Sequence, residues 1–167
     1  MDMRGQAERR FVVHLHHQGR YRFLSQASED GQRHGPSFLS DEPDPVGEAS
    51  GPSTPGLLGA AVGHCLSASL LEALRHAHIE VWDCEIEAVA VVVPNTAGLP
   101  RIDHIEVTIR PRVAQRSPRM ARCADVFEQY CTVTSSVRQG IDVRVHVDWQ
   151  VGDLSSERSQ SGDGAEP

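Results

Sequence analysis

Polar and apolar residues alternate most regularly near the end of the chain. Every second residue from 141 to 149 is apolar and the residues between them are polar, in the order Ile141, Asp142, Val143, Arg144, Val145, His146, Val147, Asp148, Trp149. Successive side chains of a strand point to opposite faces, so strict alternation is typical of a strand with one buried face. The pattern predicts a half-buried strand over these nine residues.

The first fifty residues contain shorter β-prone runs. Phe11 to His16 and Arg20 to Ser25 are separated by His-Gln-Gly, which predicts a hairpin. From Gln26 to Thr54 the chain is rich in Gly, Pro, Ser and acidic residues, so we expect a long loop with a short strand near Ser37 to Leu39. Because long loops in compact domains are often functional, we expect residues 41–53 to cover a site.

A single long helix is predicted from Thr54 to about His76. Thr54 is placed as the N-cap and Pro55 at the first helical position, where a missing N–H costs nothing. Apolar residues fall on nearly every face from residue 57 to 74, which predicts a buried central helix. A membrane span is the competing interpretation, but glycines interrupt the segment and Glu72 and Arg75 follow closely. The small residues indicate close packing against another helix or a second subunit.

Two further strands and a second helix complete the pattern. Ile79 to Val93 and Arg101 to Val113 are predicted strands joined by a turn, with a bulge in the second strand because its alternation is imperfect. Ser117 and Pro118 open a helix that is predicted to run to about Tyr130. The order predicts an α+β domain with helices against antiparallel sheet, over residues 10–152. The ends, residues 1–9 and 153–167, are predicted to be a flexible tail and a disordered tail.

Composition narrows the classes of function. The net charge of −7 argues against a protein that binds nucleic acid through phosphate contacts. All sixteen basic residues are arginine, which excludes Schiff-base chemistry and a Walker-type phosphate loop. Five arginines between Arg110 and Arg122 could receive an anionic partner, although a solvated face is the ordinary explanation. No apolar signal segment opens the chain, so a cytoplasmic, reducing setting without membrane attachment is expected.

The four cysteines provide the candidate chemistry. They stand at positions 65, 84, 123 and 131, so no C-x-x-C spacing occurs and the fold must assemble any pair. Judged by residue type and location alone, a cysteine in an apolar helix, such as Cys65, is more often a small core residue than a nucleophile. Cys84 and Cys123 fall inside a predicted strand and helix and are expected to be structural.

Two stretches around the remaining cysteines resemble a known family. Gly51-Pro52-Ser53-Thr54-Pro55-Gly56-Leu57-Leu58-Gly59-Ala60-Ala61-Val62-Gly63-His64-Cys65 is similar to the G-P-S-P-x-x-L-L-x-A-A-x-G-x-C signature of the OsmC/Ohr family. Phe127-Glu128-Gln129-Tyr130-Cys131-Thr132-Val133-Thr134-Ser135-Ser136-Val137-Arg138 is similar to the F-E-x-x-C-x-V-x-x-S-V-R form of one branch. The resemblance extends over roughly residues 10 to 150. It implies an OsmC-like fold and an intertwined homodimer with two sites at the subunit interface.

The resemblance also implies a reaction. In the family's peroxidases the first cysteine attacks an organic hydroperoxide and the second resolves the sulfenic acid as a disulfide, which assigns these roles to Cys65 and Cys131. An external dithiol, such as a lipoylated protein, or a small thiol then regenerates the pair. No metal or organic cofactor is implied.

The thiol that attacks also needs an activating cation. A free cysteine has a pKa of about 8.5, and an opposite charge in contact lowers such a value by about 1 to 3 units. Cys65 lies about eleven residues, or roughly 16 Å, beyond the start of its own helix, too far to benefit from the helix dipole. The family uses an arginine of the N-terminal hairpin, which matches Arg20. Arg138, near Cys131 in sequence, is a second candidate.

One position departs from the family pattern. The family arginine is held by a glutamate just after the proline of the first motif, and that position is Gly56 here. Glu42 or Glu48, in the loop before the helix, could substitute from another direction. We therefore expect peroxidase activity to be reduced, altered in substrate or absent.

Two other classes of function stay open. A non-catalytic protein would use the interface cavity to hold an apolar small molecule, with Gly56 as the mark of lost catalysis. A metal site formed by Cys65, Cys131 and a histidine is the third possibility. His14, His16 and His17 lack supporting ligands at metal-binding spacing, and His64 points about 100° away from Cys65 on a helix, so neither is expected to take part.

Overall fold

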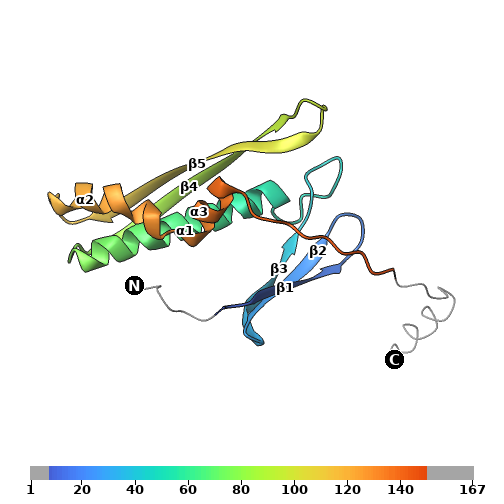
Figure 1. Cartoon of the computed structure of the whole chain (residues 1–167), viewed down its shortest axis with the longest axis horizontal. Helices are drawn as coiled ribbons and strands as arrows, with labels where there is room; N and C mark the ends of the chain where they lie inside the picture. The colour runs from blue at the N-terminus through green and yellow to red at the C-terminus, as the bar shows by residue number, and fades with distance from the viewer. Residues whose placement is uncertain (1–7, 150–167) are drawn as a thin grey trace, which may run out of the picture.

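The computed structural model describes residues 8–149, which form two antiparallel sheets and a helical layer (Figure 1). The elements in chain order are β1 (Phe11–His17), β2 (Phe23–Glu29), β3 (Gln32–Ser40), α1 (Thr54–His76), β4 (Val81–Pro94), β5 (Pro100–Val113), α2 (Arg119–Val126), the 3₁₀ turn η1 (Phe127–Tyr130) and α3 (Thr132–Gln139). The strands pair as β1-β2-β3 and as β4-β5. The predicted α+β class with antiparallel sheet is confirmed.

The three-stranded sheet extends further than the sequence pattern predicted. The β1–β2 hairpin is confirmed, but the long loop predicted from Gln26 is wrong in its first half, because β2 continues to Glu29 and β3 begins at Gln32. The turn between them is Asp30-Gly31, and both residues have positive φ, 48° and 80°. Asp-Gly is a strong signal for a tight hairpin turn, so this hairpin was readable from the sequence.

Helix α1 runs from Thr54 to His76 as predicted. The N-cap is Ser53, with φ −74° and ψ 163°, so the assignment of Thr54 as cap was wrong by one residue. Pro55 is then at the second helical position, where its N–H would also have had no partner inside the helix. Neither Ser53 nor another side chain caps this end by a hydrogen bond.

One face of α1 packs on the strand pair. The buried residues of the helix are Gly59, Val62, Gly63, Leu66, Ser67, Leu70 and Leu74. A Cβ added at Gly63 would lie 3.3 Å from the Cβ of Ala88 on β4, so glycine permits a close approach. The small residues of α1 were predicted to pack closely against another helix or a second subunit. Within this chain they pack against strand β4. By length and composition α1 could also cross a membrane, but here it is the core helix of the fold.

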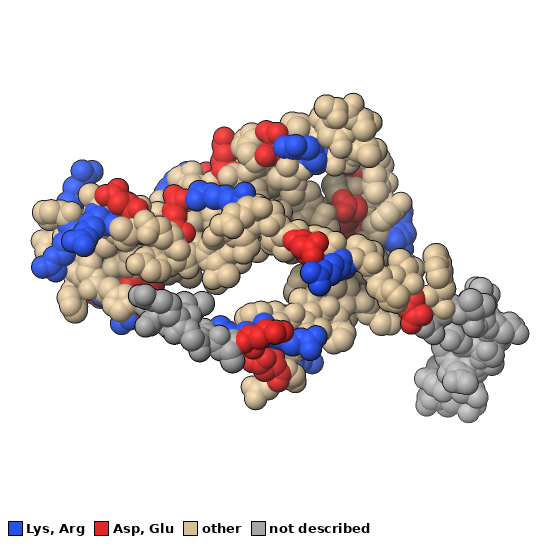
Figure 2. All heavy atoms as spheres, viewed as in Figure 1, with Lys and Arg blue, Asp and Glu red and all other residues tan. Residues whose placement is uncertain are grey.

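The strand pair β4–β5 carries the predicted bulge. Val91 pairs with His104 and Val92 pairs with Ile102, which leaves Asp103 as the extra residue of β5. A second irregularity leaves Trp82 unpaired in β4. Arginines 110, 112, 116, 119 and 122 lie exposed on β5, the following loop and α2, and Figure 2 shows basic side chains gathered over α2. Arg110 pairs with Glu87 and Arg112 with Asp83.

The region after β5 holds two helices where one was predicted. Helix α2 ends at Val126, η1 follows, and α3 begins after Cys131. The sequence Thr-Val-Thr-Ser-Ser-Val has low intrinsic helix propensity, which is why α3 was not predicted.

The predicted strand over residues 141–149 does not form in the single chain. This segment has no regular secondary structure, and Val143, Val145 and Trp149 are 78%, 81% and 83% exposed. A strand needs a hydrogen-bonding neighbour, and the segment runs from α3 away from the β4–β5 pair (Figure 1). Residues 1–7 and 150–167 are outside the described structure, so the predicted tails lie wholly or largely outside it.

Candidate functional site

Cys65 and Cys131, which are 66 positions apart in the sequence, meet in the core. Cys131 is fully buried and packs in one cluster with Cys65, Val62 and Leu66. Burial of the Cys65 thiol and its hydrogen bond with the Cys131 thiol raise the pKa of Cys65. Both sulfurs are reduced in the structure. The fold has therefore assembled a dithiol pair from distant parts of the chain.

Helix α3 directs backbone N–H groups toward this pair. Cys131 is the N-cap of α3, and its sulfur accepts a hydrogen bond of 3.4 Å from the Thr134 N–H. Hydrogen bonds from the backbone of Val133 and Thr134 also act on Cys65, where they oppose the rise in its pKa. A helix N-terminus favours negative charge, so α3 supplies the field that α1 cannot. Sequence reasoning missed this contribution because it missed α3.

The cap predicts how Cys131 tolerates substitution. Serine is a favoured N-cap residue, whereas alanine leaves the first N–H groups without an acceptor, at a cost of about 1 kcal/mol. We expect Cys131→Ser to unfold in urea at nearly the wild-type midpoint and Cys131→Ala to lose about 1 kcal/mol. Equal loss in both variants would contradict the capping role.

Arg20 lies in the β1–β2 turn and pairs with Glu48. Its guanidinium is 3.4 Å from the Glu48 carboxylate, which also binds Arg22 at 3.2 Å. Arg20 has a positive φ of 48°, so the turn holds it in a conformation that non-glycine residues seldom adopt. Of the two predicted substitutes for the missing glutamate, Glu48 has this contact, whereas no ion pair within residues 8–149 joins Glu42 to either arginine.

The loop that presents Glu48 is organised by Asp41. The Asp41 carboxylate is buried and accepts hydrogen bonds from the backbone N–H groups of Glu42, Glu48 and Ser50 and from the Ser50 hydroxyl. Burial would raise the pKa of Asp41, but these hydrogen bonds outweigh it and lower the pKa to about 2. The loop is therefore fixed by an ionised carboxylate at neutral pH.

The second candidate cation is also paired with a carboxylate. Arg138, near the end of α3, is 2.7 Å from Glu128 of η1 and its side chain is largely exposed. Within residues 8–149, the ion pairs of Arg20 and Arg138 are with carboxylates, and the main causes of the shift in the pKa of Cys65 are burial, Cys131 and the backbone of α3. The single chain thus assembles the two thiols but does not bring a predicted cation to them.

Gly56 lies on the opposite side of α1 from Cys65. Position 65 is nine positions further along the helix, or about two and a half turns, so the two residues lie on opposite sides of the axis and roughly 14 Å apart along it. A Cβ at position 56 would meet Ser53 Oγ at 3.8 Å, so there is room for a side chain. A glutamate here would face β4 and not the Cys65 thiol of the same chain.

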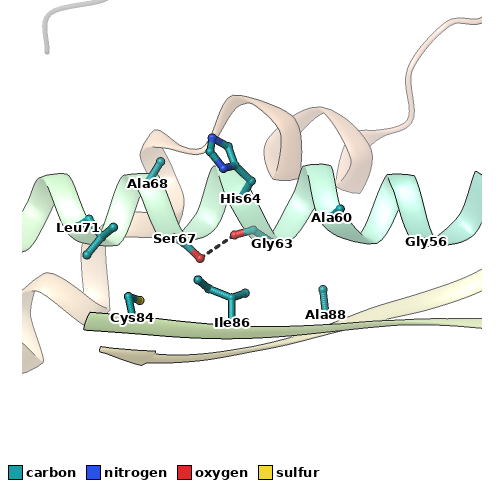
Figure 3. Close-up of a pocket in the computed structure, with 10 residues that line it drawn as sticks. All are labelled: Gly56, Ala60, Gly63, His64, Ser67, Ala68, Leu71, Cys84, Ile86 and Ala88. Atoms are coloured by element: carbon teal, nitrogen blue, oxygen red, sulfur yellow. Dashed lines mark hydrogen bonds between the residues drawn. The ribbon is translucent and has the colours of Figure 1, made fainter. Parts of the chain in front are cut away.

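An open groove runs along the line where this face of α1 meets β4 (Figure 3). Its lining is mostly small or apolar and includes Ala60, Leu71, Ile86 and Ala88, with a volume of about 530 Å³. Cys84 of β4 also lines it, and burial, followed by the nearby Asp83, raises the pKa of Cys84. His64 is exposed and points away from β4 in Figure 3.

The remaining cysteine and the histidines have ordinary surroundings. Cys123 is buried with Leu70 and Leu74, and its thiol donates to the Ala73 carbonyl at 3.5 Å. His17 bonds to the Arg20 carbonyl at 2.9 Å. In the part of the chain that the structure describes, no three His, Cys, Asp or Glu side chains are grouped to hold a metal ion.

Comparisons with known proteins give one consistent result. The sequence model of the OsmC-like protein family matches residues 47–146. An OsmC-like protein of unknown function from Vibrio cholerae is similar in structure, with TM-score 0.59, 14% identity, and coverage of 78% of this chain and 93% of that one. An organic hydroperoxide resistance protein from Legionella pneumophila gives TM-score 0.57, 13% identity, and coverage of 83% and 96%. An organic hydroperoxide resistance protein from Bacillus subtilis gives TM-score 0.51, 19% identity, and coverage of 81% of this chain and 95% of that one. No curated protein sequence matches.

Proposed function

Because this chain belongs to the OsmC-like protein family, we propose that it is a thiol-dependent redox protein that reduces organic hydroperoxides through Cys65 and Cys131. The observation that carries the proposal is the contact between these two thiols in a buried cluster. Two thiols in contact are the starting point for a disulfide, since the bond needs the two side chains to meet. The names of the Legionella and Bacillus proteins point to the same class of substrate.

The proposed reaction has three balanced steps. The Cys65 thiolate attacks the terminal oxygen of a hydroperoxide, the O–O bond breaks, and the alcohol leaves after taking a proton. The Cys131 sulfur then attacks the sulfur of the Cys65 sulfenic acid, and water leaves as the disulfide forms. Finally a dithiol reductant, such as the lipoyl group of a protein, exchanges with the disulfide and is itself oxidised.

We further propose that the working form is a homodimer. The single chain leaves many large apolar side chains in water, on β1, on β4 and along residues 141–149. All seven residues of β1 are exposed, and Figure 2 shows open space between the three-stranded sheet and the helices. Exposed apolar surface of this extent is typical of an interaction face, and a second copy would cover it. We also propose a cytoplasmic location, because a reducing compartment would keep the two thiols available for reaction.

The dimer would also complete the site. The ion pair of Arg20 with Glu48 would serve as the arginine–carboxylate pair that the family resemblance implies, and a second copy is the means by which the Arg20 guanidinium could meet Cys65. The carboxylate comes from the loop before α1 and not from the helix, where Gly56 stands. We propose that this altered support makes the protein a weaker peroxidase than one with the usual pair.

The groove beside Gly56 supports a second candidate function. Its lining between α1 and β4 is mostly apolar, so it could hold an apolar small molecule without any reaction. In that case the two thiols would be a structural pair.

Thiol counting after peroxide treatment separates these functions. We expect one equivalent of cumene hydroperoxide to remove two of the four thiols per chain, with a mass loss of about 2 Da as two hydrogen atoms leave in a disulfide. Hydrogen peroxide at the same concentration is the comparison for substrate class. Protein that keeps all four thiols while it binds an apolar fluorescent probe would favour the binding function.

A further inference from the structure

The buried hydroxyl of Thr134 is placed against the thiol that would resolve the reaction. Thr134 is 6% exposed and lies in the first turn of α3. The Cys131 thiol donates to its Oγ1 at 3.0 Å, while the Thr134 backbone N–H donates to the same sulfur at 3.4 Å. Cys131 itself has no exposed surface, so water cannot replace these partners.

We propose that Thr134 is a positioning residue whose hydroxyl aims Cys131 at Cys65 and stabilises its sulfur during disulfide closure. The inference rests on the proposed function for its biological meaning, since closure is the resolving step. The closure itself can be measured without peroxide.

The chemistry of a hydroxyl suits this role. A threonine hydroxyl accepts a hydrogen bond from a thiol and, after rotation, donates one to a thiolate. One side chain can therefore remain bonded to Cys131 before and after its proton leaves. A buried charge without such partners is costly, and hydrogen bonds to charged groups are stronger than those between neutral groups. Valine has the same shape but can neither accept nor donate.

The position of α3 makes the contact directional. Cys131 has an extended backbone, with φ −85° and ψ 101°, and its carbonyl accepts from the Ser135 N–H at 3.0 Å. Two bonds with one residue, Thr134, then fix the Cys131 side chain toward the cluster that contains Cys65. Removing the hydroxyl leaves the backbone bond and the helix in place, so the variant isolates the side-chain contribution.

Closure can be followed with an aromatic disulfide, 5,5′-dithiobis(2-nitrobenzoate). In a Cys84→Ser, Cys123→Ala background, the reagent reacts with Cys65 first, because Cys131 is buried, and releases one coloured thiolate. Cys131 then attacks the Cys65 sulfur of the mixed disulfide, its proton passes to solvent, and a second coloured thiolate leaves. The second release reports closure alone.

We expect Thr134→Val to slow the second release at least about tenfold and to leave the first release unchanged. Its pH–rate curve should move to higher pH, whereas a purely structural defect would lower the rate by one factor at every pH. Thr134→Ser should restore the wild-type rate, and Thr134→Ala should behave like valine if the valine variant folds poorly. Thr132→Val, on an exposed position of the same turn, is the matched control.

The outcomes separate the inference from the proposed function. Closure at the wild-type rate in both Thr134→Val and Thr134→Ala, or a serine variant as slow as valine, would overturn the inference. Wild-type protein that never releases the second equivalent would overturn it as well. Normal closure with the expected Thr134 effect, in a protein that ignores hydroperoxides, would uphold the inference and refute the peroxidase.

Discussion

Replacing Cys65 by serine is expected to abolish the reaction with organic hydroperoxide, so that peroxide disappears no faster than in buffer. A serine hydroxyl stays protonated near neutral pH, whereas a thiol supplies a nucleophile as its thiolate. The substitution removes one sulfur from a cluster that otherwise keeps Val62, Leu66 and Cys131, so the fold should persist. Peroxide consumption and thiol content, measured together, check this.

The matched variant is Cys131→Ser, which keeps the cap of α3. It should react once and stop at the sulfenic acid of Cys65, detectable as a mass gain of about 16 Da for one oxygen atom and prone to further oxidation. Cys84→Ser serves as the control on the neighbouring strand, with no expected effect on consumption. Unchanged peroxide consumption in Cys65→Ser would show that the reaction lies elsewhere.

The second large effect concerns the dimer. Val145→Asp places a carboxylate on the apolar side of residues 141–149, and we expect the dimer dissociation constant to rise at least about a hundredfold, which is ~2.7 kcal/mol. Burying an ionised carboxylate at an interface is costly, whereas the exposed side of a strand tolerates it. His146→Asp, one residue along on the polar side, is the matched control. Sedimentation across a range of concentrations gives the constant.

Two results would contradict this expectation. Equal dimer strength in the two variants would show that the segment is not an interface. A wild-type protein that stays monomeric at high concentration would remove the reason given for the exposed apolar side chains of β1 and residues 141–149. Such a monomer would also leave Arg20 with no route to the thiol pair.

Some features of the molecule could be predicted from local sequence. Helix α1, the β4–β5 hairpin and a bulge in β5 follow from residue periodicity and turn residues, which act over a few positions, and the structure places the bulge at Asp103. The Asp30-Gly31 turn carried a comparable signal that was outweighed by the polar composition around it. The helix α3 carried little signal, because its β-branched residues disfavour a helix and tertiary packing around Cys131 holds it in place.

The candidate site could also be predicted only in part from the sequence. The two cysteines were identified through their resemblance to family motifs, and their contact depends on a fold that no spacing rule describes. The partner of Arg20 was predicted as Glu42 or Glu48, and the loop built around Asp41 selects Glu48. The alternation over residues 141–149 predicted a strand, and this prediction is wrong for the single chain, in which the segment pairs with neither sheet.

The pairing of Cys65 with Cys131 is tested most directly by mapping the disulfide after one equivalent of organic hydroperoxide. Because the chain has no lysine, trypsin cuts only after arginine and leaves Cys123 and Cys131 together in residues 123–138; a second protease that cleaves after Glu128 separates them. The account predicts one cross-linked product that joins the Cys65 peptide to the Cys131 peptide. A link through Cys84 or Cys123, or four unlinked cysteines, would contradict it.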